Sequence, residues 1–464
     1  MEVRPALLRQ LGVVSATALV VSNMIGTGIF TTTGFVAGDL GSPSLVLWIW
    51  VVGAACALTG AMCYSELGVN LPSSGGEYVY LTEAYGPTWG FMTGWVSFFA
   101  GFSAPIAAAG LAFAAYAGYF FPTLLPDSAP AIAGHGDWTF RLGGAQWTVV
   151  ALVTVFTILN VLGVQRAARV QNVLTGLKIT VVVSFVALGF LSGHGNAANF
   201  SLPTARDTAT PVSEQFAISL FWIYVAYSGW NAATYVAEEL RHPARTLPLA
   251  LAIGTALVAV IYVGLNLVFI YAAPLSDLKG KVAVGALAAS RLFGPEVAGV
   301  FSGLMALSLL ATVNAMVTIG PRVYYAMAKN GAFLSSAAEV HPRWHTPVGA
   351  IVAQGICAAL MSVTPFPQLV IYIGFTLNFF AVLSVGSLFL LRRRRGWKKL
   401  RVVSFCYPLF PLLFVAVGVW MIIWGVQLKP FVSLAAVVTI ATGALVYHLR
   451  LKSRAPKTPA VETY

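Results

Sequence analysis

Apolar runs of about twenty residues recur along almost the whole chain, and they constrain its fold more than any other feature. A helix of about 20 apolar residues is long enough to cross a hydrocarbon core of ~30 Å. Only 9% of the 464 residues are charged and 58% are hydrophobic, whereas a soluble domain has roughly 25% charged residues. The pattern predicts an all-α polytopic membrane protein.

Twelve such runs can be separated, and each is expected to form one transmembrane helix. Loops on the cytoplasmic side of a membrane are rich in Lys and Arg. With a cytoplasmic N-terminus, twenty of the 27 Lys and Arg residues fall in cytoplasmic segments, six fall outside and one lies within a span. Both termini are therefore predicted to be cytoplasmic, with the protein in the plasma membrane. The expected spans are 13–39, 44–69, 88–121, 147–163, 170–191, 213–237, 247–272, 296–328, 347–364, 368–391, 402–425 and 430–449.

The segments between the spans are expected to differ in role. The 193–212 loop is predicted to be extracellular and irregular, and residues 283–293 to form a short helix across the outer mouth. The 70–87 loop has no Lys or Arg, and we expect it to pack on the body of the protein, as a gate does. The basic run of the 392–401 loop is interpreted as a topology signal in contact with lipid headgroups.

The net charge of +12 does not indicate a nucleic-acid partner. Most of the charge lies in short loops and in the tail after His448, which is the distribution of a topology signal. The four cysteines lie inside predicted spans, the six histidines lie mostly in loops, and neither set shows the spacing of a metal site or a disulfide framework. We expect no metal, no cofactor and no nucleic-acid partner.

The first span is interrupted near its middle. The sequence Ser22-Asn23-Met24-Ile25-Gly26-Thr27-Gly28 replaces the continuous Leu and Val of an ordinary membrane helix. Glycine in a helix interior costs about 1 kcal/mol relative to alanine, and a break in hydrocarbon frees backbone N–H and C=O groups that need partners. The stretch therefore predicts a discontinuous helix whose exposed backbone binds a ligand.

A second interruption, Val225 to Trp230, lies in the sixth span, five spans after the first. Paired breaks at corresponding places in two halves indicate a midplane binding site in an inverted-repeat transporter. The alternative is that Gly26, Gly28 and Gly229 only allow close helix packing. The predicted division is an N-terminus (1–12), a first five-helix repeat (13–192), an extracellular loop (193–212), a second, inverted repeat (213–391), a basic loop (392–401), helices 11 and 12 (402–449) and a tail (450–464).

The chemistry of broken helices suggests the ligand. N–H groups of Gly26, Thr27 and Gly28 at the start of a new half-helix have positive dipole character, which suits a carboxylate. Carbonyl groups that end the first halves suit an ammonium group. A carboxylate and an ammonium group held together describe an α-amino acid. These carbonyls are expected to come from Asn23, Met24, Val225 and Ala226.

Four fragments resemble those of the amino acid–polyamine–organocation superfamily, and within it the L-type amino acid transporter-like permeases. They are IGTGIF (25–30), YSELGVNLPSSGGEYVYLTEAYG (64–86), AYSGWNAATYVAEELRHPARTLPLAL (226–251) and GPRVYYAMAKNG (320–331). The resemblance implies a LeuT-like fold of five plus five inverted spans with two more helices, and discontinuous helices 1 and 6. It implies substrate contact at Ile25, Gly26, Thr27, Gly28, Val225, Ala226 and Ser228, and Trp230 is a further candidate.

Lys178 is the one Lys or Arg well inside a predicted span. An ionisable residue inside a membrane is a functional candidate by default, although a purely structural lysine is the alternative. In some members of the superfamily a lysine here fills the space of a sodium ion, and Lys178 resembles that residue. It is expected either to replace sodium as a fixed charge, giving sodium-independent exchange or uniport, or to carry a coupling proton.

Other candidates carry weaker signals. Asn23, Ser308, Thr312 and Asn314 could support the site, although hydroxyls in membrane helices often bond their own backbone. Glu66 is expected to pair with Arg241, Arg245 or Arg322.

The sequence thus predicts a secondary transporter of neutral L-amino acids that works by alternating access. A proton-coupled symporter for amino acids, polyamines or other amines is the alternative within transporters. A channel or a membrane-embedded enzyme is the alternative of another class. The expected partners are an amino acid, membrane lipid and, for the symporter, protons.

Overall fold

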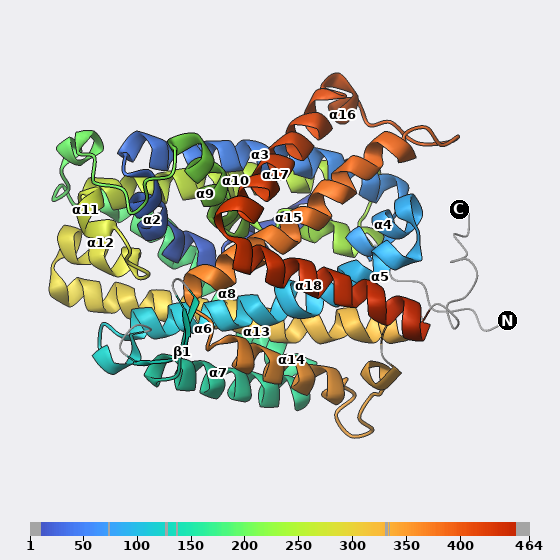
Figure 1. Ribbon diagram of the computed structural model, residues 1–464, viewed down its shortest axis with the longest axis horizontal. Helices are drawn as coiled ribbons and strands as arrows, with labels where there is room; N and C mark the ends of the chain where they lie inside the picture. The colour runs from blue at the N-terminus through green and yellow to red at the C-terminus, as the bar shows by residue number, and fades with distance from the viewer. Residues whose placement is uncertain are drawn as a thin grey trace.

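The computed structural model describes residues 11–72, 75–125, 129–135, 138–329, 333 and 335–451. Long helices run roughly side by side between two ends of the molecule, and α11 (Leu275–Leu278) and α12 (Val284–Phe293) lie at the end opposite α4 (Glu77–Tyr85) (Figure 1). The residues predicted to form the N-terminus, Arg4 and Arg9 among them, lie outside the described part up to residue 10, as do residues 452–464 of the predicted tail.

Within the described residues, nine helical stretches are long and apolar enough to cross a membrane. A tenth is the bent pair α1 (Val13–Met24) and α2 (Thr27–Leu40). The prediction of an all-α polytopic membrane protein is confirmed. The nine stretches belong to α3 (Pro43–Asn70), α5 (Pro87–Val96) continued through the π-helical turn η1 (Ser97–Ser103) into α6 (Ala104–Ala117), α7 (Gly144–Val161), α8 (Val164–Leu191), α10 (Pro243–Ala272), α13 (Pro295–Lys329), α15 (Phe366–Leu391), α17 (Leu409–Leu428) and α18 (Pro430–Val446).

The remaining predicted spans are also helical. Residues 213–237 hold α9 (Val212–Tyr227) and the 3₁₀ helix η4 (Ala232–Glu239), and residues 347–364 hold α14 (Val348–Met361). The predicted amphipathic segment is α12, and the 70–87 loop contains a short helix, α4 (Glu77–Tyr85). In the 193–212 segment the regular structure is one 3₁₀ turn, η3 (Ala197–Ser201).

Two details differ from expectation. The predicted span 402–425 is divided into α16 (Arg401–Phe405) and α17, because Pro408 cannot donate the backbone hydrogen bond that a continuous helix requires. A two-stranded antiparallel hairpin, β1 (Ala131–His135) with β2 (Trp138–Arg141), was not predicted. The other short elements are the 3₁₀ turns η2 (Pro122–Leu124) and η5 (Ser335–Ala338) and the π-helical turn η6 (Tyr447–Leu451).

Burial divides the long helices into central and peripheral ones. The membrane-spanning stretch of α15 is 78% buried inside the protein, whereas that of α17 is 28% buried. Both are strongly apolar, and a helix that is apolar all round lies in a core or against lipid. α15 is therefore a central helix and α17 a peripheral one whose exposed apolar face suits the hydrocarbon of a bilayer.

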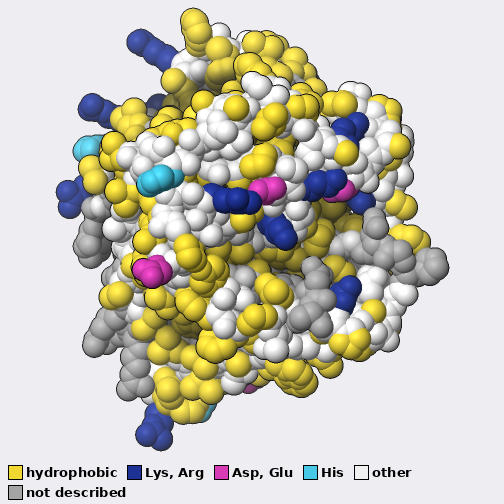
Figure 2. All heavy atoms as spheres, turned by 90° about the vertical axis from the view of Figure 1, so that its left-hand side faces the viewer, with side chains coloured by type: hydrophobic (Ala, Val, Ile, Leu, Met, Phe, Trp, Pro, Cys, Tyr) yellow, Lys and Arg dark blue, Asp and Glu magenta, His cyan; other side chains and the backbone are white. Residues whose placement is uncertain are grey.

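Basic and acidic side chains lie next to one another on the end of the molecule around α11 and α12 (Figure 2). The Lys279 ammonium lies 2.6 Å from the Asp207 carboxylate, and the Arg291 guanidinium lies 2.7 Å from the Asp277 carboxylate. Such exposed pairs contribute little to stability. The basic segment 392–401 belongs to the opposite end, next to α4.

Candidate substrate site

The first predicted interruption is a break between α1 and α2. The backbone leaves the helix at Ile25 (φ −69°, ψ 91°) and stays extended at Gly26 (φ −130°, ψ −153°). The two helices are bent by 44° relative to each other. The first N–H groups of α2 have no preceding helical turn to supply acceptors, so this end of α2 can bind an anion.

The second predicted interruption ends α9 at Tyr227. Gly229 adopts φ +98°, a conformation that glycine reaches without steric penalty. The Ser228 N–H and hydroxyl both donate to the Val225 carbonyl, at 3.1 and 2.7 Å. The last turn of α9 is thereby closed, and the chain continues through a turn into η4.

The two breaks lie against each other. A Cβ atom on Gly28 would come within 2.4 Å of the Ala226 Cα, and one on Gly229 within 2.9 Å of the Asn23 backbone. Any larger residue at either glycine would push the helices apart. These glycines therefore permit close helix packing, and the same packing brings together the two segments predicted to bind substrate.

The contact between the breaks leaves some of its residues accessible. Ile25, Gly28 and Ala226 are buried, whereas Gly26, Thr27, Val225 and Ser228 are partly exposed. Thr312 of α13 faces the first break, because its hydroxyl lies 4.0 Å from the position of a Cβ atom on Gly26. Among the described residues this buried hydroxyl has no hydrogen-bond partner. Thr312 is therefore placed to contact a ligand at Gly26.

Lys178 reaches the first break from α8. Its side chain is 2% exposed, and its Nζ donates a hydrogen bond of 3.0 Å to the Ser22 carbonyl. That carbonyl lies in the last turn of α1, where the helix leaves acceptors without intrahelical donors. The lysine thus joins α8 to the end of α1.

Tyr262 of α10 contacts both breaks, and sequence reasoning missed it. Its hydroxyl donates to the Met24 carbonyl at 2.6 Å and lies 3.1 Å from the Ala226 carbonyl. Trp50 and Tyr227 pack against its ring, with centroids 5.5 and 5.1 Å away. A tyrosine in the interior of an apolar span was the available signal. It did not reveal the partners, because they come from two other helices.

Three weaker candidates satisfy their hydrogen bonds elsewhere. The Asn23 amide donates to the Leu19 carbonyl at 2.9 Å, and the Ser308 hydroxyl to the Leu304 carbonyl at 2.8 Å, each within its own helix. Asn314 accepts from Asn160 of α7 at 3.3 Å and donates to Gln171 of α8 at 3.0 Å. Asn314 therefore links α13 to α7 and α8.

Trp230 faces a different cavity. Its ring packs 4.7 Å from that of Tyr64 and 6.1 Å from that of Phe414. Trp230 lines a small, mostly apolar pocket between α3, α9, α15 and α17. Asn378 also lines this pocket, and its amide donates to the Gly418 carbonyl at 3.0 Å. Trp230 thus belongs to the second break, and its ring packs against α3 and α17.

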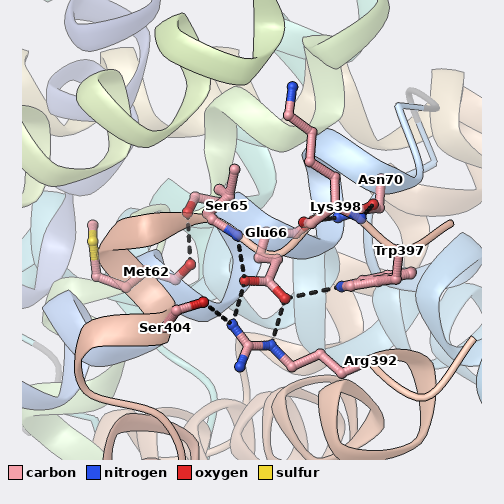
Figure 3. A network of polar contacts seen from close by, with 9 residues as sticks. Met62, Ser65, Glu66, Asn70, Arg392, Trp397, Lys398 and Ser404 are labelled. Atoms are coloured by element: carbon pink, nitrogen blue, oxygen red, sulfur yellow. Dashed lines mark hydrogen bonds and ion pairs between the residues drawn. The ribbon is translucent and has the colours of Figure 1, made fainter.

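Glu66 is paired with Arg392, not with Arg241, Arg245 or Arg322 as expected. The guanidinium binds both carboxylate oxygens, at 2.6 and 2.7 Å, and the Trp397 indole N–H donates at 2.9 Å (Figure 3). The Leu400 backbone N–H adds a bond of 3.0 Å. The basic run is therefore partly internal, because Arg392 crosses from the end of α15 to α3.

Comparison with known proteins identifies the family. A family model described as amino acid permease matches residues 11–446. The chain belongs to this amino acid permease family. The permease is 30% identical over 456 residues to the Asc-type amino acid transporter 1 of Mus musculus, with 96% of this chain and 82% of the relative covered.

Two further relatives have the same extent. The large neutral amino acids transporter small subunit 2 of Mus musculus is 30% identical over 96% of this chain and 81% of its own length. The b(0,+)-type amino acid transporter 1 of Homo sapiens is 28% identical over 96% of this chain and 88% of its own. The predicted superfamily is confirmed, and this integral membrane protein is an amino acid transporter, not an enzyme.

Proposed function

We propose that this permease carries neutral L-amino acids across the plasma membrane by alternating access, as a sodium-independent exchanger or uniporter. The observation that carries the proposal is the contact between the two helix breaks, Gly28 on Ala226 and Gly229 on Asn23. Broken helices that meet in the middle of a bundle are the usual substrate site of inverted-repeat transporters. The names of the relatives, which include a transporter of large neutral amino acids, support this substrate class.

The site binds the carboxylate and ammonium groups that all α-amino acids share. The carboxylate lies at the start of α2, on N–H groups of Thr27 and Gly28 and near the Thr312 hydroxyl. The ammonium group lies on carbonyl groups that end α1 and α9. A carbonyl oxygen accepts two hydrogen bonds, so the bond from Tyr262 leaves the Met24 carbonyl capacity for the substrate, whereas the Val225 carbonyl already accepts two bonds from Ser228. Val225, partly exposed, contacts the substrate side chain.

Sodium is unnecessary because side chains already bind the carbonyls at the breaks. Lys178 donates to Ser22 at 3.0 Å, and the Tyr262 hydroxyl lies within hydrogen-bond distance of Met24 and Ala226. A cation would otherwise be the natural ligand for such a group of carbonyls. A second candidate is proton-coupled symport through Lys178. Proton coupling is favoured by the position of the Lys178 amine, which is buried against the last turn of α1.

The orientation follows from the basic residues. Both termini and the basic 392–401 loop are cytoplasmic, the 193–212 segment is extracellular, and residues 13–192 and 213–391 form inverted repeats. The inner gate consists of α4, η4 and Leu11. Leu11 accepts a hydrogen bond of 2.8 Å from Arg241 and donates one of 3.0 Å to Glu239. These bonds attach the start of α1 to the segment after α9.

Counterflow of radiolabelled amino acids in proteoliposomes tests the proposal. We expect saturable counterflow of neutral L-amino acids that is unchanged when choline replaces sodium, and its loss in Lys178→Ala. Ser433→Ala is the matched control, because this buried hydroxyl bonds the Gly425 carbonyl between α18 and α17, outside the contact between the breaks. Sodium-stimulated uptake, or flux that does not saturate, would overturn the proposal. Accumulation driven by an imposed pH gradient would favour the proton symporter.

A further inference from the structure

Glu77, the first residue of α4, joins α4 to α3 and to the residue that precedes η4. Its carboxylate accepts a hydrogen bond of 2.6 Å from the Tyr64 hydroxyl of α3 and one of 3.2 Å from the Asn231 amide. Asn231 directly follows the second break and precedes η4. Movement of either α4 or η4 away from α3 therefore breaks at least one bond to this carboxylate.

The groups around Glu77 are neutral. Within the described part of the chain no Lys, Arg or His forms an ion pair with it, whereas Glu66, Glu83, Asp207 and Asp277 are each paired with a cation. The titratable groups that face it are phenols: Tyr64 on α3, Tyr80 on α4, Tyr224 on α9 and Tyr235 on η4. The helices α5 and α15, which pack against α4, contain no Asp, Glu, Lys, Arg or His.

Partial burial, with no cationic partner among the described residues, makes the charge state of Glu77 sensitive to its surroundings. Removal of water raises the pKa of this carboxyl, and the bonds from Tyr64 and Asn231 offset only part of that effect. When the gate opens, water solvates the carboxylate and this penalty is relieved. The closed gate thus binds a proton more tightly than the open gate does.

We propose that Glu77 is a proton-binding site through which cytoplasmic pH controls the closing of the inner gate. The inference rests on the proposed function, since it requires this end of the molecule to be cytoplasmic. On closing, one proton passes from cytoplasmic water to a carboxylate oxygen, and on opening it returns to the same water. No proton crosses the membrane in this cycle, so the site regulates transport and does not couple it to a proton gradient.

The sign of the pH effect follows from linkage. Because the closed state has the higher proton affinity, lowering the pH favours closing and raising it favours opening. For one proton, the ratio of open to closed gates changes by at most about tenfold per pH unit. Glu77 has one pKa in the open gate and a higher pKa in the closed gate. At pH values between these two, acidification therefore decreases access to residues behind the gate.

A buried cysteine provides a reporter that needs no transport. Thr234 of η4 is 0% exposed, and Thr234→Cys keeps the side-chain size. In purified protein whose four native cysteines are replaced, the rate of labelling by a water-soluble maleimide is measured between about pH 5 and 8. Maleimide labelling of any thiol depends on its ionisation. The labelling rate of Thr234→Cys is therefore divided by that of an exposed reporter, Lys399→Cys, at the same pH. The corrected rate is expected to fall several-fold as the pH falls.

Substitutions at Glu77 decide the outcome. Glu77→Gln is expected to make the corrected rate independent of pH, and Glu77→Asp to preserve the dependence. Glu83→Gln, on the same helix, is the matched control and should behave like the parent. Size-exclusion profiles and thermal unfolding identify any variant that fails to fold. A pH dependence that survives Glu77→Gln, or is absent from the parent, overturns the proposal, whereas loss of amino acid counterflow would overturn only the transport proposal.

Discussion

Glu66 and Glu77 lie on either side of the loop after α3 and present the same carboxylate to different surroundings. The Glu66 side chain is completely buried, and a guanidinium, an indole N–H and a backbone N–H bind it. The partly buried Glu77 has bonds from a phenol and an amide. A charge-matched carboxylate stabilises one arrangement of α3 and α15, while a carboxylate with neutral donors can exchange a proton. Partner charge, more than burial, separates a structural role from a regulatory one.

The largest effect is expected from Glu66→Ala. Removal of one member of a buried ion pair leaves Arg392 without a counter-charge, and such changes destabilise proteins by about 3–5 kcal/mol. Thermal unfolding of the detergent-solubilised protein should show this loss. The double variant Glu66→Leu with Arg392→Leu should recover part of it, because neither charge then remains buried. A Glu66→Ala protein as stable as its parent would contradict the structural role.

Asn231→Lys would give Glu77 the kind of partner that Glu66 has. An opposite charge next to a carboxylate lowers its pKa by about 1–3 units. The pH at which the Thr234→Cys reporter becomes protected should therefore fall by a similar amount. Asn231→Gln, which keeps a neutral amide, is the control. An unchanged midpoint in the lysine variant would mean that partner charge does not determine the difference between the two glutamates.

Tyr64→Phe should change the same midpoint in the opposite direction. The phenol donates to the Glu77 carboxylate at 2.6 Å, and loss of a donor to the charged form raises the pKa of the acceptor. We expect the gate to close at a pH about one unit higher, because a hydrogen bond to a charged group contributes a free energy of about that size. Tyr80→Phe, which removes a neighbouring phenol with no hydrogen bond to Glu77, should leave the midpoint near that of the parent. A fall in the midpoint of Tyr64→Phe would refute this account.

The smallest effect is expected from Glu83→Gln. The Glu83 carboxylate lies 2.8 Å from the Arg394 guanidinium, and the arginine side chain is 47% exposed. Exposed ion pairs contribute about 0.2–1 kcal/mol, so thermal unfolding should change little. Arg394→Gln should have a similarly small effect. A loss as large as that of Glu66→Ala would mean that exposure does not distinguish these pairs.

Local features of the sequence predicted the helical architecture and the two breaks. Hydropathy is a property of each segment by itself, so the long apolar runs indicated membrane helices directly. The glycines of Ile25–Phe30 and Val225–Trp230 marked the ends of α1 and α9 because backbone preference is also local. The division of residues 402–425 by Pro408 was a local signal that the hydropathy argument overlooked.

The partners of the polar side chains were decided by tertiary structure. Arg392 reaches Glu66 across 326 residues of sequence, and Tyr262 lies next to Met24 and Ala226 because α10 packs behind both breaks. A sequence lists the groups that need partners but not the segments that packing brings within 3 Å of them. The sequence by itself therefore determined that this chain forms membrane helices and that α1 and α9 end at glycine-containing breaks. Tertiary structure decided that Glu66 meets a cation and that, in the described part of the chain, Glu77 does not, because this depends on which distant segments pack against α3.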